Sequence, residues 1–159
     1  MFNVGDKIVY PMHGAGIIEA IEEKEILGER KRYYVMKMPL GNMKVMIPIN
    51  NVESIGIRDV IGQKDADKVF KSFETRSHEQ PSNWNKRYRE NMEKIKSGDV
   101  FEVADVVKSL MLREKNRGLS TGERKMLHSA KQILISELVL AKNMNPSDVE
   151  EMINSRLWN

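Results

Sequence analysis

The chain of 159 residues contains no cysteine and no long apolar run. Without cysteine, a disulfide framework and a metal site built from thiolates are both excluded. No apolar run approaches the roughly 20 residues of a membrane span. Asn3, Asp6 and Lys7 interrupt the N-terminal residues, so no signal peptide is expected. We therefore expect a soluble cytoplasmic protein that forms one medium domain or two small ones and does not enter a membrane.

The net charge is small, +3 at pH 7, and it is unevenly distributed. Residues 1–56 carry equal numbers of basic and acidic side chains, so the whole excess lies in residues 57–159. Residues 82–98 hold five basic and two acidic side chains, whereas the tail after Asn145 is acidic. A patch this small neutralises few phosphates, so we expect weak binding to free DNA. The neutral N-terminal half suits protein contacts better.

Residues 1–56 have the pattern of a small antiparallel β-barrel. Residues 14–16, Gly-Ala-Gly, are expected to interrupt the strand pattern between the first two strands. Met46 falls on the polar face of the fourth strand. The five expected strands are short runs bounded by glycine, proline or asparagine: Lys7–Tyr10, Ile17–Leu27, Lys31–Met38, Met43–Ile47 and Val52–Ile55.

In residues 57–159 the apolar residues recur at helical spacing, which predicts an all-α domain of about five helices. Asp99 with Glu102, and Ser120 with Glu123, are spaced as capping boxes, and Asn145-Pro146 is typical of a helix start. The expected helices are Lys64–Phe73, Ser82–Ser97, one between Asp99 and Gly118, one from Ser120 through Ala141, and one from Pro146. A proline-bearing connection is expected from Thr75 to Pro81. The sequence thus predicts an α+β protein with domains at 1–56 and 57–159.

Trp84 is the most informative residue of the helical half. It opens a helix among polar and basic neighbours, Asn83, Asn85, Lys86 and Arg87, where a core tryptophan would have apolar ones. Cations can hold phosphates while a flat apolar ring presses on or between bases, so the combination suits a nucleic-acid contact. The alternative is an amphipathic tryptophan that anchors the start of its helix against the next helix, with its N–H in water.

Other residue groups give no case for catalysis or for a cofactor. His13, His78 and His128 are scattered without metal-ligand spacing, so no metal is expected. The carboxylates of Glu22, Glu23 and Glu25 fit a solvated strand face. The Gly-Ala-Gly run precedes a strand, whereas a dinucleotide-binding loop needs a helix there. No nucleophile has a visible base partner, and we expect a protein that is not an enzyme and has no cofactor.

Several segments resemble the CarD/CdnL family of bacterial transcription factors. Residues 4–16, VGDKIVYPMHGAG, are similar to the start of the RNA-polymerase-interacting domain, which transcription-repair coupling factors share. Asn83-Trp84 followed by Arg87-Tyr88 and then by Lys96-Ser97-Gly98-Asp99 also matches. So does RGLSTGERKMLHSAKQILISEL, residues 117–138. The resemblance covers residues 2–139 and implies a Tudor-like or SH3-like barrel followed by a helical DNA-interacting domain.

The resemblance implies that the barrel docks on the RNA polymerase β subunit by strand-to-strand contact. The positions that match the docking strands are Lys24, Ile26 and Met46. The family often has arginine at the positions of Lys24 and Met46. Because Met46 cannot form an ion pair, the surface is expected to be more apolar here or to use Lys44.

The resemblance also implies that Trp84 contacts upstream promoter DNA as a wedge in the minor groove at the edge of the transcription bubble. Lys86, Arg87 and Arg89 would hold flanking phosphates. The implied function is to stabilise the promoter open complex at many promoters, because few base contacts are involved. The protein is expected to act as a monomer.

Two other functions remain open from the residues alone. One is a protein that binds only polymerase, in which Trp84 has a purely structural role. The other is a small RNA-binding or ribosome-associated barrel, which predicts basic and aromatic residues on residues 1–56. That segment is charge-neutral, which favours the transcription factor.

Overall fold

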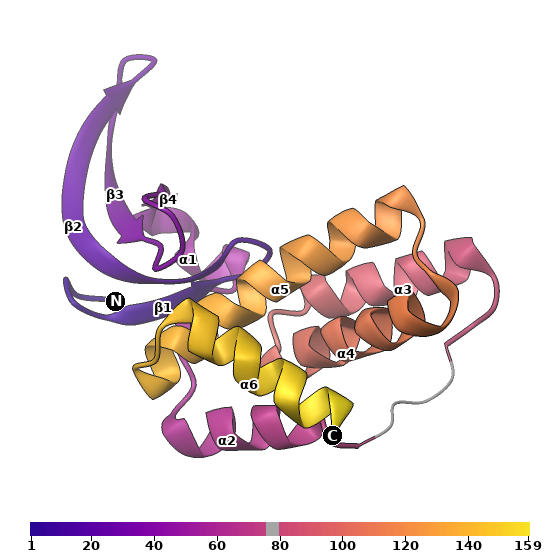
Figure 1. Ribbon diagram of the computed structural model, residues 1–159. Helices are drawn as coiled ribbons and strands as arrows, with labels where there is room; N and C mark the ends of the chain where they lie inside the picture. Colours follow the sequence, from indigo (N-terminus) through magenta and orange to yellow (C-terminus); the bar gives the residue numbers. More distant parts are fainter. Residues whose placement is uncertain (76–79) are drawn as a thin grey trace.

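A computed structural model describes residues 1–75 and 80–159. Within these ranges the chain forms five strands, a 3₁₀ turn at Ile49–Asn51 and six α-helices. The sheet lies at one end of the molecule and the longer helices pack together at the other (Figure 1). The strands are β1 (Lys7–Tyr10), β2 (Gly14–Ile26), β3 (Glu29–Lys37), β4 (Lys44–Pro48) and β5 (Arg58–Asp59). The helices are α1 (Val52–Ile55), α2 (Gln63–Ser72), α3 (Trp84–Lys96), α4 (Val100–Arg117), α5 (Thr121–Lys142) and α6 (Pro146–Trp158).

This arrangement confirms the predicted α+β class, with four strands before the first helix and the five longer helices after the last strand. His78 and most of the expected connection from Thr75 to Pro81 lie outside the described residues.

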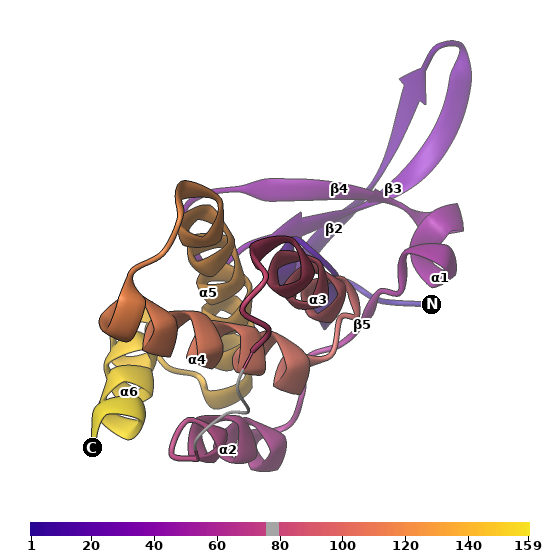
Figure 2. The same ribbon diagram turned by 90° about the vertical axis from the view of Figure 1, so that its right-hand side faces the viewer.

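The strands form one antiparallel sheet in the order β4-β3-β2-β1-β5. The β2–β3 pairing continues to Ile26 and Glu29, well beyond the parts of these strands that pair with β1 and β4. The outer half of this hairpin is therefore a two-stranded ribbon, and it projects away from the helices (Figures 1 and 2). A register shift between Ile18 and Ala20 marks a bulge, which increases local twist and bends the strand.

The last strand of the sheet differs from the prediction. Val52–Ile55 forms helix α1, not a strand, and the fifth strand is β5, which pairs with β1. Val52 and Ile55 are three residues apart, so both can contact the sheet core from one face of a helical turn. Gly56 ends that turn in the left-handed region at φ 85°. The sheet consequently continues past the domain boundary expected at residue 56.

The expectation that residues 14–16 lie outside the strands is also wrong, because they begin β2 and are buried. A Cβ at Gly14 would lie 2.7 Å from Ser136 Oγ, and one at Gly16 would lie 2.6 Å from Met36 Cγ. These glycines allow β2 to approach α5 at Ser136 and β3 at Met36 closely.

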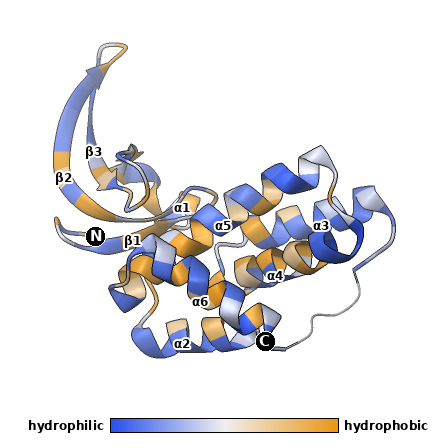
Figure 3. Ribbon diagram, viewed as in Figure 1, coloured by the Kyte–Doolittle hydropathy of each residue, from blue (hydrophilic) through white to orange (hydrophobic). Residues whose placement is uncertain are grey.

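The molecule has two apolar cores (Figure 3). The sheet encloses Ile8, Ile18, Tyr34, Met36, Met38 and Ile47. The larger core lies between α2, α3, α4, α5 and α6. The predicted apolar faces of the helices are confirmed except at Ala141, which is only partly buried. The residues confirmed as buried are Val69, Phe70, Phe73, Val103, Val106, Val107, Leu110, Met111, Leu127, Ala130, Leu134 and Leu138.

The helix starts follow the predicted capping residues. The Asp99 side chain accepts from the backbone N–H groups of residues 101 and 102, and Asn145 caps α6. Helix α3 begins at Trp84, later than the predicted Ser82, because the Asn83 side chain accepts from the N–H of Lys86 at 3.1 Å.

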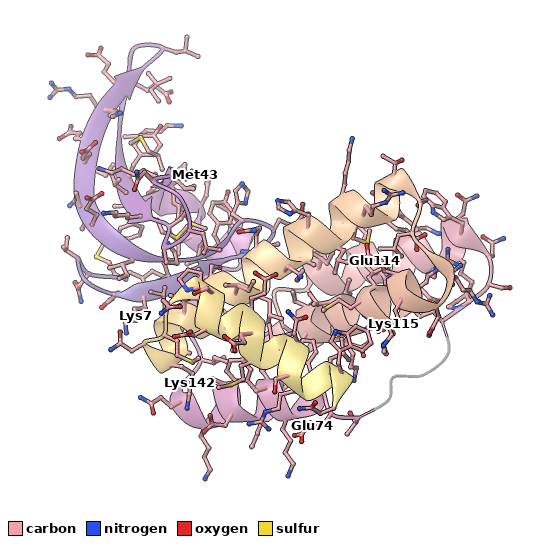
Figure 4. All side chains as sticks on the ribbon, in the orientation of Figure 1. Lys7, Met43, Glu74, Glu114, Lys115 and Lys142 are labelled. Carbon is pink, nitrogen blue, oxygen red and sulfur yellow. The ribbon has the colours of Figure 1, made fainter. Side chains whose placement is uncertain are left out.

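Helix α5 joins the sheet through polar contacts. The N–H of Ala15 donates to Ser136 Oγ at 2.8 Å. Arg58 on β5 holds both carboxylate oxygens of Glu137 at 2.7 and 2.8 Å. The Nε of Arg58 also donates to the carbonyl of Gly98, between α3 and α4, at 2.8 Å. Lys7, visible in Figure 4, donates to the Leu140 carbonyl at 3.3 Å. Arg58 thus links the sheet to two parts of the helical half.

Replacing Gly14 by alanine should lower the free energy of unfolding by about 2–4 kcal/mol, because the new Cβ meets a bound hydroxyl at a backbone φ of 114°. Urea unfolding measures this. The control is Gly62→Ala, where φ is not in the left-handed region and a Cβ meets open space; it should change stability by about 1 kcal/mol or less. Equal losses in both variants would contradict the close approach.

Candidate functional site

Trp84 is both exposed and anchored. Its side chain is 41% exposed at the first position of α3. The ring stacks on Tyr88, with centroids 5.0 Å apart and planes inclined by 21°. The indole N–H donates to Ser120 Oγ at 2.9 Å, so it is held by the residue that caps α5 and not by water. The structure therefore combines a surface ring with an anchoring contact to another helix.

Arg87 is not on the surface, and the expectation that it holds a phosphate is wrong. Its side chain is buried, and its guanidinium donates to the two carboxylate oxygens of Glu123 at 2.9 and 3.2 Å. It also donates to the carbonyls of Pro81 and Ser82. The sequence signal for this burial is weak: Arg87 lies eight residues before the apolar Ile95, so the two lie on a similar side of α3.

The charge on Glu123 depends on Arg87. Burial raises the pKa of Glu123, but the hydrogen bond and positive charge of Arg87 outweigh it, with smaller contributions from Ser120 and Arg113. The pKa consequently lies below the ordinary value of 4.5, so the carboxylate stays ionised at neutral pH.

Lys86 and Arg89 are exposed, as expected, but they lie on the other side of α3 from Trp84, because a helix turns by about 100° per residue. A different lysine lies on the Trp84 side. Lys125 on α5 lines a surface groove of about 240 Å³ together with Tyr88 and Gly122. Sequence reasoning missed Lys125 because it considered only the charges next to Trp84 along the chain.

The residues expected to dock on polymerase share one face of the sheet. Register pairs Lys24 with Lys31, Ile26 with Glu29, and Met46 with Val35. Side chains alternate between faces along a strand, and Lys24, Ile26, Lys44 and Met46 all fall on the face opposite the sheet core. These four residues define the outer sheet face.

These four residues do not form one tight cluster. Lys24 and Met46 pair with β3 residues four apart, which is roughly 13 Å along the strand. Ile26 is 50% exposed at the outer end of the ribbon, whereas Met46 is partly buried. Lys44 forms an ion pair with Glu19 at 3.1 Å. Strand β4 pairs only with β3 among the described residues, so its other edge is free there.

In residues 1–75 and 80–159, no three histidine or carboxylate side chains are placed to hold a metal ion. No helix in the same ranges is long and apolar enough to cross a bilayer.

Comparison with known proteins agrees with both halves of the structure. Residues 2–61 match the CarD-like/TRCF RID domain, and residues 68–154 match the CarD C-terminal domain. The chain belongs to the CarD family. It is also 44% identical to the "Putative transcription factor YdeB" of Bacillus subtilis (strain 168), over 94% of this chain and 98% of that protein. The resemblance found in the sequence is confirmed, and the sheet has the Tudor-like fold of the first domain.

These matches make this CarD-family chain a transcription-related protein and point to a regulator that is not an enzyme. The first matched domain ends at residue 61, just after β5. That end agrees with the position of the last strand better than a boundary at residue 56.

Glu123→Gln should lower the free energy of unfolding by about 3 kcal/mol at pH 7, because it leaves the buried Arg87 charge unpaired. A lowered folded-state pKa contributes stability that is complete above the unfolded pKa and is lost as pH falls through the folded one. The difference in the free energy of unfolding between wild type and variant should therefore become smaller below about pH 4.5. Urea unfolding from pH 7 to pH 3 measures it.

The matched control is Glu90→Gln on the exposed side of α3. It should stay within about 0.5 kcal/mol of wild type at every pH. A Glu123→Gln defect that is constant with pH would contradict an ionised Glu123.

Proposed function

We propose that this protein regulates transcription by docking its outer sheet face on the RNA polymerase β subunit and contacting promoter DNA with Trp84 at the upstream edge of the transcription bubble. Membership of the CarD family and the match to the CarD-like/TRCF RID domain support the choice of polymerase. The observation that carries the DNA contact is a half-exposed tryptophan at a helix end with cations on both sides of its helix.

The free edge of β4 supports docking by strand addition. Unpaired N–H and C=O groups on a strand edge can bond to another strand, while side chains on one face fix the register. Lys24 lies opposite Lys31 beside the exposed Ile26, and Lys31 forms an ion pair with Glu29 at 3.5 Å. An acidic partner surface would complement the charge of Lys24.

The geometry of Trp84 supports a wedge. An exposed aromatic plane can cover a base step that has lost its stacking partner, at a site where unstacking costs a few kcal/mol. Lys125 shares a groove with Tyr88, on which the ring stacks, and would hold a phosphate there, while Lys86 and Arg89 are available on the far side of α3. These few cations give weak affinity for free DNA, and tethering to polymerase supplies a high effective concentration.

On this proposal the protein shifts an equilibrium and transforms no substrate. It binds the open promoter better than the closed one and so stabilises the open state. It would activate promoters at which opening limits the rate, and inhibit those at which escape from the promoter does.

A second candidate is a polymerase-binding protein in which Trp84 is structural. The hydrogen bond from Trp84 to Ser120 and its stacking on Tyr88 favour this reading, because both contacts fasten α3 to neighbouring residues. The two candidates differ in what removal of the ring does to open complexes and to stability.

Charge reversal at Lys24, or aspartate in place of Ile26 or Met46, should weaken binding to purified polymerase at least fivefold, which corresponds to about 1 kcal/mol. The affinity is measured by titration, and circular dichroism checks that each variant is folded. Arg30→Glu is the matched control, because Arg30 pairs with Glu25 on the opposite face of the same ribbon. Docking through the outer sheet face would be refuted if Arg30→Glu were the most damaging change.

Trp84→Ala should shorten the lifetime of promoter open complexes about tenfold, equal to about 1.4 kcal/mol, and leave polymerase affinity unchanged. The free energy of unfolding should fall by only about 1–2 kcal/mol, because the ring is half-exposed. Decay of open complexes on one promoter is measured beside urea unfolding. Trp158→Ala is the control, since Trp158 is 40% exposed at the end of α6. A large stability loss without faster decay would favour the structural role.

A further inference from the structure

The hydroxyl of Ser120 makes three hydrogen bonds that meet at one atom. It accepts from the indole N–H of Trp84 at 2.9 Å and from the backbone N–H of Glu123 at 3.2 Å. It donates to Glu123 Oε1 at 3.3 Å. One donor and two acceptor positions are all that a serine hydroxyl offers, so its capacity is fully used.

The same carboxylate continues the network back to α3. The carboxylate of Glu123 accepts two hydrogen bonds from Arg87, which lies three residues after Trp84 on the same helix. The chain of contacts Trp84–Ser120–Glu123–Arg87 therefore leaves α3, crosses to the start of α5 and returns to α3. Arg87 and Glu123 are both buried, whereas Trp84 is the exposed end of the network.

We infer that Ser120, supported by the buried Arg87–Glu123 pair, is a positioning residue that fixes the orientation of the Trp84 ring before any partner binds. This inference rests on the proposed function for its consequence, although the positioning itself is a property of the free protein. A ring that is already held loses less side-chain freedom when it contacts DNA, and such preorganisation strengthens binding.

The surroundings of the ring show why a hydrogen bond is needed. Tyr88 covers part of the ring, and Gly122 lies beneath it without a side chain. A Cβ at Gly122 would meet Trp84 Cζ2 at 3.5 Å and Tyr88 Cε2 at 3.8 Å, which are ordinary contact distances. Stacking on Tyr88 does not fix the angle of the indole within its own plane. The directional hydrogen bond to Ser120 selects one such angle.

The test uses full-length protein carrying Trp158→Phe, so that Trp84 is the sole tryptophan. The variant is Ser120→Gly, because glycine is nearly as good as serine as an N-cap but has no hydroxyl. We expect an upfield shift of the Trp84 indole ¹H–¹⁵N resonance and a larger fast component in its fluorescence anisotropy decay. Ser120→Thr should restore both signals toward those of wild type, because the hydroxyl is retained.

The same variants are then compared in the decay of open complexes. Ser120→Gly should speed decay about two- to fivefold with polymerase affinity unchanged, and Ser120→Thr should behave as wild type. Asn145→Ala, which removes the cap of α6 far along the chain from Trp84, is the control for a general loss of helix stability. It should leave both the indole signals and the decay unaltered.

The outcomes separate the inference from the proposed function. If Ser120→Gly leaves the indole resonance and anisotropy unchanged, the positioning role is refuted, whatever the promoter assay shows. If the indole signals change but neither Ser120→Gly nor Trp84→Ala alters decay, positioning stands and the wedge function fails. If Trp84→Ala speeds decay and a loosened ring in Ser120→Gly does not, positioning and the wedge function both stand, and the contribution of preorganisation to that function is overturned.

Discussion

A buried ion pair, Arg87 with Glu123, is the contact on which the exposed end of α3 depends. Two charges removed from water are favourable only when both are paired and their remaining hydrogen-bonding groups are satisfied. Here the guanidinium also meets two carbonyls of the segment that enters α3, and the carboxylate meets the cap of α5. The pair thus fixes a loop, two helix starts and, through Ser120, the indole of Trp84. Its partners leave little freedom for any of them to move alone.

In the sheet, side chains alternate between the two faces along each strand. One face carries the apolar core, and the other carries the residues proposed to meet polymerase. The hairpin extends beyond its neighbours, so no second layer from residues 1–75 or 80–159 lies behind its outer half. Such a ribbon has exposed backbone edges on both sides, which suits association with another strand better than independent stability.

Much of the fold could be predicted because its signals are local. Helix periods, N-cap residues and the Asn-Pro start depend on residues a few positions apart, and the structure follows them closely. The errors concern contacts that are distant in sequence. Gly14 and Gly16 look like a turn until Ser136 and Met36 are seen against them. Arg87 looks like a surface cation until Glu123, 36 residues later, is placed beside it. Lys125 was missed for the same reason.

The clamp made by Arg58 gives the molecule a mechanical property. Its guanidinium holds Glu137 on α5 and the turn before α4, while its backbone is part of the sheet. Ser136, the preceding residue on α5, is bonded to β2 as well. The sheet and the helices are therefore joined through several polar contacts. If the sheet is seated on polymerase, as proposed, this connection would hold Trp84 at one fixed position along the duplex, so that geometry would select where it touches DNA without base contacts.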